Sequence, residues 1–206
     1  MRKTKTFLRV SFMLLALSGL LFAGCSSSSD DDPPQTAPVK PISGITVYDA
    51  NGDAYSGENI NFTKVLGVGQ GGEAVETFTA LGLTGAQVKV TDKKLTVNLG
   101  TQPVANGKLG AMPEDRFTVN PPSARFYEIY EFKNDTSSKK LELLKVEGGN
   151  VKGLASPFYT SEAVSVNGLS FIKGWNWLMF EMEGDGSPYV GNPMALGFKW
   201  YIDFDW

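Results

Sequence analysis

The chain has 206 residues, a formal net charge of −3 and 42% hydrophobic residues, a composition that suits a protein with a sizeable core. It contains no histidine, which excludes Ser-His-Asp and Cys-His catalysis and metal sites built on imidazole ligands. The acidic balance argues against nucleic acid as a partner, because such binding needs a basic footprint. We therefore expect no catalytic residue, no metal and no cofactor.

The N-terminal segment has the layout of an export signal. It opens with four basic residues, which are Arg2, Lys3, Lys5 and Arg9. An uncharged, mostly apolar run follows from Val10 to Phe22. That run is too short to cross a bilayer as a helix, which takes roughly 20 apolar residues. We expect residues 1–24 to be a signal peptide and leave them out of the reasoning about the fold.

The segment ends in Phe22-Ala23-Gly24-Cys25, and Cys25 is the only cysteine of the chain. These four residues resemble the lipobox of bacterial lipoproteins, with Phe22 at a position where Leu or Val is usual. The resemblance implies cleavage before Cys25, attachment of three acyl chains including palmitate to Cys25, and anchoring in a membrane. The alternative is an ordinary signal peptide that is cut elsewhere.

Residues 25–41 predict a tether, because serine, aspartate and proline dominate and cannot bury enough apolar surface to order themselves. Ser26 follows the cysteine, as in lipoproteins of enteric bacteria that are sorted to the outer membrane. The acidic run that comes next resembles surface-export signals of some Bacteroidetes. We expect an envelope protein, lipid-anchored in the outer membrane, with its periplasmic or surface placement left open.

Beyond the tether, glycine is frequent and short runs alternate apolar with polar residues, which favours strands. The first two predicted strands cover 45–48 and about 60–68. The stretch Gly44-Ile45-Thr46-Val47-Tyr48-Asp49, followed by Gly52 and Gly57, loosely resembles the first hairpin of bacterial immunoglobulin-like and carboxypeptidase-regulatory-like modules. The connection at 49–53 superficially resembles a calcium loop, but its glycine is misplaced, so we interpret it as a turn. The glycine-rich segment 67–72 predicts a flexible loop. It lacks the following helix that a dinucleotide fingerprint needs.

Two strands are predicted at 87–90 and 94–99, followed by a long proline-containing connection over 100–124. Segments 125–133 and 140–146 then predict a hairpin. The alternative for the first of these is a helix that starts at Pro122, because the apolar residues there also fit helical spacing.

The last predicted strands cover 163–166, 169–173, 175–182 and 198–206. Many short strands joined by short turns are typical of a sandwich or a barrel. We predict that residues 42–206 form a single all-β domain. Its expected form is an antiparallel β-sandwich of immunoglobulin-like or jelly-roll-like type, with a partly open barrel as the alternative.

Aromatic residues are concentrated near the C-terminus. One predicted face of the last strand consists of Phe198, Trp200, Ile202, Phe204 and Trp206. A period of two is typical of a strand with one buried face, so we expect this face to close the core. The alternative is a ligand platform that stacks on sugar rings, formed by Trp175, Trp177, Tyr201 and Trp206. An outer-membrane barrel also has alternating strands, but the earlier strands are too short and charged for its lipid-facing band.

Gly174-Trp175-Asn176-Trp177, followed later by an aromatic strand, also resembles a stretch of spirochaete lipoproteins. That resemblance implies an envelope location and no particular activity.

Paired carboxylates are the remaining candidates for chemistry. Glu181, Glu183 and Asp185 flank a turn, and Asp203 and Asp205 share one strand face. Glycosidases need two carboxyl groups roughly 5–10 Å apart, but a solvated strand face gives this spacing by chance. We therefore predict a non-enzymatic envelope lipoprotein with a binding or structural role, whose partners are the lipid bilayer and a glycan or protein ligand. The alternative is a carbohydrate-binding or carbohydrate-acting surface protein.

Overall fold

The computed structural model describes residues 38–112, 117–136, 138–182 and 186–204. Cys25 and most of the predicted tether lie outside these residues. Pro38 forms a bridge with Asn176, and the Val39 N–H donates to the Trp175 carbonyl at 3.0 Å. The first described residues therefore already contact the folded domain.

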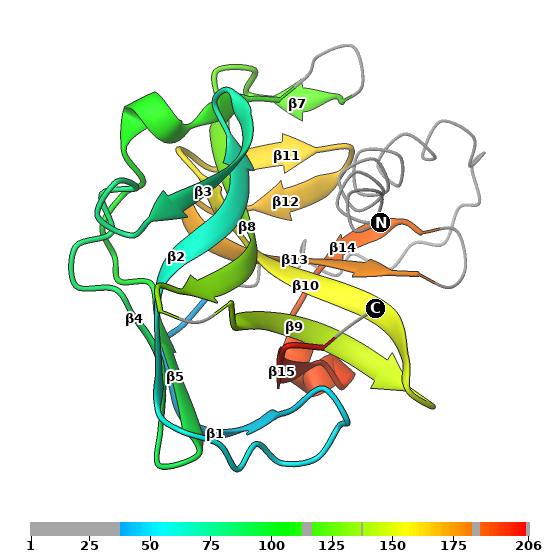
Figure 1. Ribbon diagram of the computed structural model, residues 1–206. Helices are drawn as coiled ribbons and strands as arrows, with labels where there is room; N and C mark the ends of the chain where they lie inside the picture. Colours follow the sequence, from blue (N-terminus) through cyan, green and yellow to red (C-terminus); the bar gives the residue numbers. More distant parts are fainter. Residues whose placement is uncertain (1–37, 113–116, 137, 183–185, 205–206) are drawn as a thin grey trace, which may run out of the picture.

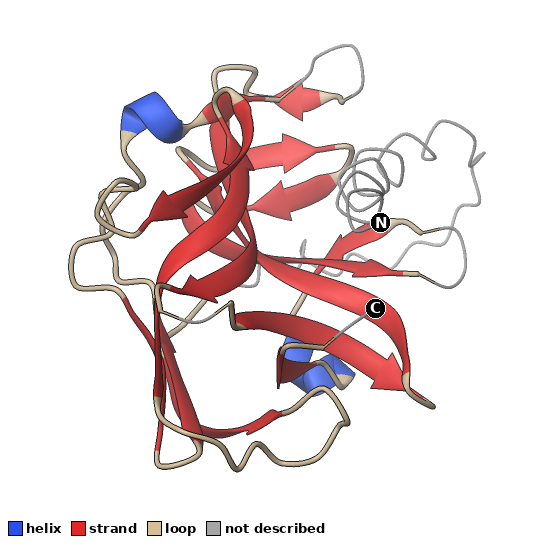
Figure 2. Ribbon diagram, viewed as in Figure 1, coloured by secondary structure: helices blue, strands red, loops and turns tan. Residues whose placement is uncertain are grey.

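The described residues are almost all strand and loop (Figure 2). Two short 3-10 helices occur among them, η2 (Asn106–Lys108) and η3 (Pro193–Leu196). The strands are β1 (Ile42–Tyr48), β2 (Ile60–Gly69), β3 (Gly72–Thr77), β4 (Gln87–Thr91), β5 (Lys94–Asn98), β6 (Gly110–Ala111), β7 (Val119–Asn120), β8 (Arg125–Asn134), β9 (Lys140–Glu147), β10 (Asn150–Thr160), β11 (Val164–Val166), β12 (Leu169–Phe171), β13 (Gly174–Glu181), β14 (Pro188–Val190) and β15 (Lys199–Ile202). The predicted all-β class is confirmed.

Eight strands close into a mixed β-barrel, in the order β10-β8-β2-β4-β5-β1-β15-β9 and back to β10 (Figure 1). The pairing of β1 with β15 is parallel, with Val47 opposite Trp200, and this pair makes the barrel mixed. The predicted antiparallel sandwich is therefore wrong as a description of the connectivity, and the barrel is closed where the alternative was partly open. The reason is physical, because a parallel pair between distant segments leaves no local turn signal in the sequence.

Three strands of the barrel pair with one another at a junction. β8 pairs with the start of β9 through Phe132 and Lys133, and with the end of β10 through residues 126–128. The remainder of β9 pairs with the beginning of β10. The predicted strand over 125–133 is confirmed, and the helical alternative for this segment is wrong.

The barrel interior is a packed apolar core. Strand residues such as Val65, Leu95, Val97 and Ile129 are fully buried in it. The connections over 78–86 and 99–109 add further apolar side chains to the same cluster, which are Phe78, Leu81, Leu83, Leu99, Val104 and Leu109. The alternation expected in 94–99 is confirmed, because Leu95, Val97 and Leu99 all point into this core.

A small sheet with the order β12-β11-β7 lies outside the barrel (Figure 1). It covers residues of β10 and β13 that alternate with those facing the barrel core, such as Phe158 and Leu178. The rings of Phe158 and Phe171 have centroids 4.9 Å apart within this second cluster. The molecule therefore has two layers on this side, which is the local feature that resembles a sandwich.

The predicted alternation of the C-terminal strand holds only up to Ile202. Trp200 and Ile202 point into the barrel core, whereas Tyr201 belongs to a cluster on the opposite face of β15. Asp203 has φ +55°, which breaks the strand geometry. Phe204 consequently packs against Tyr201, with ring centroids 5.1 Å apart, and not in the core with Trp200 as predicted. Trp206 lies outside the described residues.

The glycine-rich segment 67–72 is not the flexible loop that we predicted. Gly67 and Gly69 belong to β2, and a tight turn leads directly into β3. A Cβ atom on Gly67 would lie 2.7 Å from the Tyr127 ring, and one on Gly69 would lie 2.6 Å from the same ring. These glycines are therefore explained by the close approach of β8.

Replacing Gly69 with alanine should destabilise the fold. The added methyl group would overlap the Lys108 carbonyl oxygen, a main-chain atom that cannot rotate away. We expect a loss of about 1–3 kcal/mol in the free energy of unfolding, measured by urea denaturation. Gly107→Ala is the matched control, because nothing lies within 4 Å of its added Cβ. Equal effects of the two substitutions would contradict this account of Gly69.

Candidate functional site

The residues predicted as a ligand platform are buried where the structure describes them. Trp175 is 6% exposed, Trp177 3% and Tyr201 5%, while Trp206 lies outside the described residues. The Trp175 ring contacts Tyr159 at 5.3 Å between centroids, and Trp177 contacts Trp200 at 6.1 Å. These three rings pack against the protein itself and present no open face to a sugar.

Asn176, between the two tryptophans, has a structural role. Its amide nitrogen donates to the carbonyls of Ile172 and Gly174, at 2.8 and 3.0 Å, and its amide oxygen accepts from the Ile172 N–H at 3.0 Å. The side chain is fully buried and holds the turn that precedes β13. The Gly-Trp-Asn-Trp sequence is thus explained by a turn followed by core residues.

The predicted acidic residues are not assembled into one described site. Glu181 accepts from Lys145 at 2.9 Å and from Tyr189 at 3.3 Å, and the Lys145 contact is the main reason that the pKa of Glu181 is lowered. Asp203 instead accepts from the Lys140 N–H at 2.9 Å. Glu183, Asp185 and Asp205 lie outside the described residues. Within the described ranges, no group of three or more Cys, Asp or Glu residues is placed to hold a metal ion.

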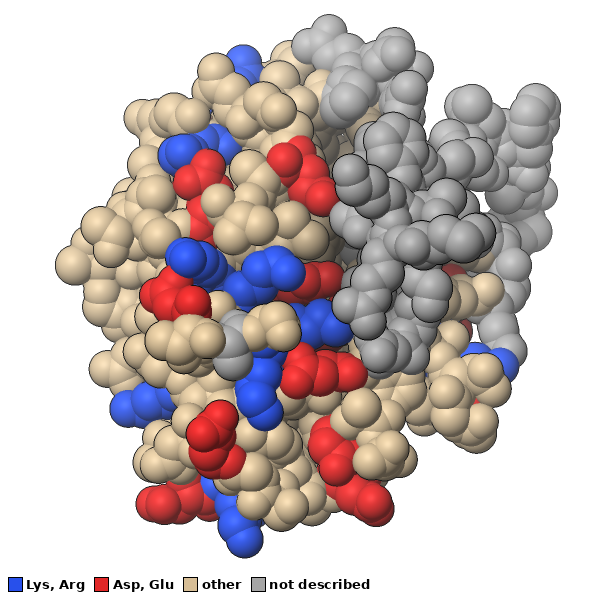
Figure 3. Space-filling model, in the orientation of Figure 1, with Lys and Arg blue, Asp and Glu red and all other residues tan. Residues whose placement is uncertain are grey.

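The outer face over β2, β8 and β9 is covered by charges of both signs (Figure 3). Ion pairs join Lys64 to Asp135 at 2.6 Å and Lys133 to Glu131 at 3.0 Å, and a largely buried pair joins Lys140 to Glu142 at 2.9 Å. Because the signs alternate, the field of one charge is largely cancelled by its neighbour. This face therefore offers no large patch of one sign to a charged partner.

A buried carboxyl group, Glu128 of β8, was not anticipated from the sequence. It is 7% exposed and accepts from the Ser156 hydroxyl at 2.6 Å. Burial raises its pKa to about 7, and the Ser156 hydrogen bond opposes this effect. This hydrogen bond gives both buried side chains a polar partner. Neither residue lines the cleft described next.

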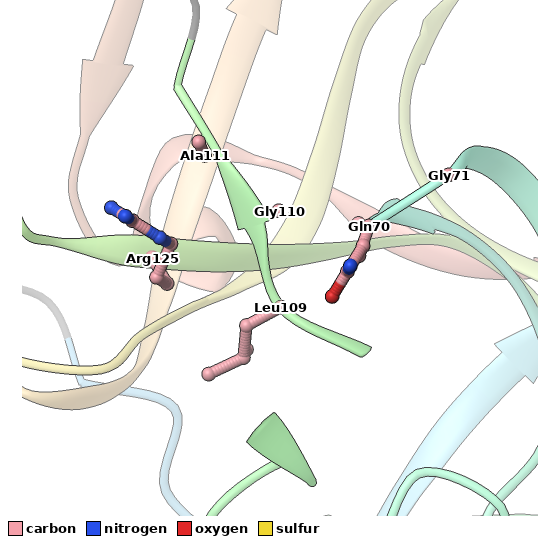
Figure 4. A pocket seen from close by; sticks show the side chains of 7 residues that line it. Gln70, Gly71, Leu109, Gly110, Ala111 and Arg125 are labelled. Carbon is pink, nitrogen blue, oxygen red and sulfur yellow. The ribbon is translucent and has the colours of Figure 1, made fainter. Parts of the chain in front are cut away.

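An open cleft of about 350 Å³ lies where β6 diverges from the β2–β3 turn (Figure 4). It is lined by Gly69, Gln70, Gly71, Leu109, Gly110, Ala111 and Arg125. The Gln70 N–H donates to the Lys108 carbonyl at 2.9 Å, which ties the two sides of the cleft together. A Cβ on Gly110 would lie 2.8 Å from the main chain of Gly69, so the crossing requires glycine. The cleft walls are therefore mainly backbone.

Arg125 supplies the charge of this cleft. It is an exposed residue at the start of β8, and Ala111 lies directly opposite it in the β6–β8 register. Its Nη1 atom donates to three main-chain carbonyls, those of Pro122 at 3.3 Å, Ser123 at 2.8 Å and Ala124 at 3.1 Å. No ion pair joins Arg125 to an acidic side chain in the part of the chain that the structure describes. An arginine held in this way suits the recognition of an anionic group.

Sequence reasoning singled out Gly69 and Gly71 of the cleft within segment 67–72 but assigned them to a flexible loop, and Gly110 fell within the predicted connection over 100–124. It placed Arg125 only as the first residue of a strand. The sequence signal that could have placed Arg125 beside these glycines is weak, because the pairing of β6 with β8 involves just two residues of β6.

Comparison with known proteins gives no match, whether to a family model, a curated protein or a solved structure. Among the described residues, no helix has the length and apolar character needed to cross a membrane.

Proposed function

We propose that the protein is a lipid-anchored envelope protein that acts by binding and not by catalysis. The observation that carries the proposal is the sequence Phe22-Ala23-Gly24-Cys25, after a basic and then an apolar segment. Its resemblance to a lipobox implies a cleaved signal peptide and an acylated Cys25. Several acyl chains hold a protein on a membrane far more stably than one does.

The fold supports a binding role for the domain behind this anchor. The barrel core is filled with aromatic and aliphatic side chains, so the scaffold is rigid and recognition falls to its surface. The chain also lacks histidine, and acylation of its single cysteine would leave no thiol for catalysis. The cleft at Arg125 is the described surface feature that best fits recognition of a small group.

We further propose the outer membrane as its location, because Ser26 follows Cys25. The described domain begins at Pro38, so thirteen residue steps separate it from the lipid-bearing cysteine. A chain of that length spans at most about 45 Å when extended, so the barrel stays near the bilayer.

The anchor can be tested by metabolic labelling. Cells that express the full chain should incorporate radioactive palmitate into it, and Cys25→Ser should abolish that label. Globomycin, which blocks lipoprotein signal peptidase, should cause the unprocessed form to accumulate. Ser27→Ala is the control and should label like the unchanged chain. Processing at another position without palmitate label would refute the proposed anchor.

A further inference from the structure

We propose that the cleft at Arg125 binds a carboxylate group, held by the arginine side chain. The inference names the ligand chemistry of the binding role proposed above and rests on that role, but it does not depend on the lipid anchor. It is carried by the constraint on Arg125, its lack of an acidic partner, and the lining of the cleft.

The guanidinium group is fixed before any ligand arrives. Three carbonyls in the turn before β8, those of Pro122, Ser123 and Ala124, accept hydrogen bonds from Nη1. The Nε–H and Nη2–H groups donate to no acceptor among the described residues. A cation already held in place loses less conformational entropy on binding than a free arginine side chain. The two remaining nitrogens are therefore available as a preorganised pair of donors.

The charge of Arg125 is not cancelled locally. Lys108 directly precedes the lining residue Leu109, and its ammonium group pairs with Glu76 at 2.8 Å. Glu162 follows Ser161, whose hydroxyl accepts from the Arg125 N–H at 2.9 Å, and it accepts from the Ser123 hydroxyl at 2.8 Å. Both of these groups already have partners, whereas Arg125 carries a positive charge that no acidic side chain in the described chain balances.

The lining favours a carboxylate over a phosphate. Among the described residues that line the cleft, Arg125 is the only charged one. One guanidinium edge matches the two oxygens of one carboxylate, whereas a phosphate carries close to two negative charges at neutral pH. The rest of the described lining is largely glycine and alanine, at Gly69, Gly71, Gly110 and Ala111, which leaves room for a small group. Peptide C-termini and uronic acids both carry such a carboxylate.

The test uses the full-length chain in detergent and follows NMR signals of the Arg125 Nε–H and of the Gly71 and Ala111 amides. N-Acetylglycine represents a peptide C-terminus and glucuronate represents an acidic sugar. We expect saturable shifts with at least one of them, and the tighter of the two identifies the source of the carboxylate. Inorganic phosphate and sulfate should bind at least fivefold more weakly.

Two variants separate binding from folding. Ala111→Glu places a competing carboxylate opposite Arg125 while leaving the Nη1 hydrogen bonds in place, and it should weaken binding at least tenfold. Ala111→Gln is its matched control, because it adds a side chain of the same size without the charge, so it should weaken binding less than Ala111→Glu does. Arg125→Gln should also weaken binding at least tenfold, while Lys89→Gln, on β4 outside the cleft, should not.

The proposal is overturned if neither carboxylate shifts these signals, if Ala111→Glu binds like Ala111→Gln, or if phosphate binds as tightly as the carboxylates. Each of these results would leave the palmitate experiment unaffected. A failure of the binding site is therefore distinguishable from a failure of the anchor.

Discussion

Replacing Trp200 with alanine should lower the free energy of unfolding by about 3–5 kcal/mol, the usual cost of truncating a buried tryptophan. Trp200 is 2% exposed and contacts Phe132 and Trp177, with ring centroids 6.0 and 6.1 Å away. It also pairs with Val47 and Leu143, so it sits where β15 joins both of its neighbours. Chemical denaturation followed by far-UV circular dichroism measures the loss.

Trp200→Phe is the control for this prediction. The indole N–H of Trp200 is buried and has no hydrogen-bond acceptor, so phenylalanine removes an unsatisfied donor while keeping a ring. We expect the phenylalanine variant to lose less than half as much stability as the alanine variant. An alanine variant within 1 kcal/mol of the unchanged protein would contradict the core role of Trp200.

Glu128 should make the stability of the protein fall as the pH rises through 7. Its pKa is raised by burial from 4.5 to about 7 in the folded state, so the folded protein holds this proton more tightly than the unfolded chain. The resulting stabilisation is fully present below about pH 4.5 and is lost as the pH passes 7. By linkage, the contribution amounts to roughly 3 kcal/mol.

The experiment compares Glu128→Gln with the unchanged protein in urea between pH 5 and pH 8.5. Glutamine can still accept the Ser156 hydrogen bond but does not ionise, so the difference in stability between the two proteins should change with pH. Ser156→Ala removes a hydrogen bond that lowers the Glu128 pKa, so it should move the transition to higher pH. Parallel stability profiles for Glu128→Gln and the unchanged protein would contradict the raised pKa.

Local patterns predicted the strands well, because a period of two is a property of neighbouring residues. Leu95 and Val97 were expected on a buried face and are fully buried. Tyr127 and Ile129 likewise point into the core from a segment whose helical spacing had left a second interpretation open. Confirmation of the all-β class follows from such short-range signals.

Long-range pairing was beyond these patterns. Nothing near Val47 indicates that it pairs with Trp200, and this pair decides between a sandwich and a closed barrel. Asp203 shows the same limit on a smaller scale, since its positive φ turns Phe204 out of the alternation. The backbone conformation of one residue depends on contacts that the sequence period does not contain.

The candidate site was the hardest part to predict. Aromatic residues were the strongest sequence signal for a ligand site, but the Trp175 and Trp177 rings are buried in the core, where they stabilise the fold. Arg125 gave no signal of its own, because its position in a cleft depends on the crossing of Gly69 and Gly110. Sites made of backbone and one charge leave little trace in a single sequence.

The parallel pairing of β1 with β15 has a consequence for the order of events in folding. β1 is the first strand of the described chain and β15 the last, so the barrel cannot close until both are present. Contacts between such distant segments form slowly, because a long loop must be closed first. In a chain exported N-terminus first, the edge of β1 that pairs with β15 would stay unpaired until β15 had crossed the membrane, while the other edge of β1 could already pair with β5. If the protein is exported as proposed, this delay would keep the chain unfolded during transport, and the arrival of β15 on the other side of the membrane would allow the barrel to close.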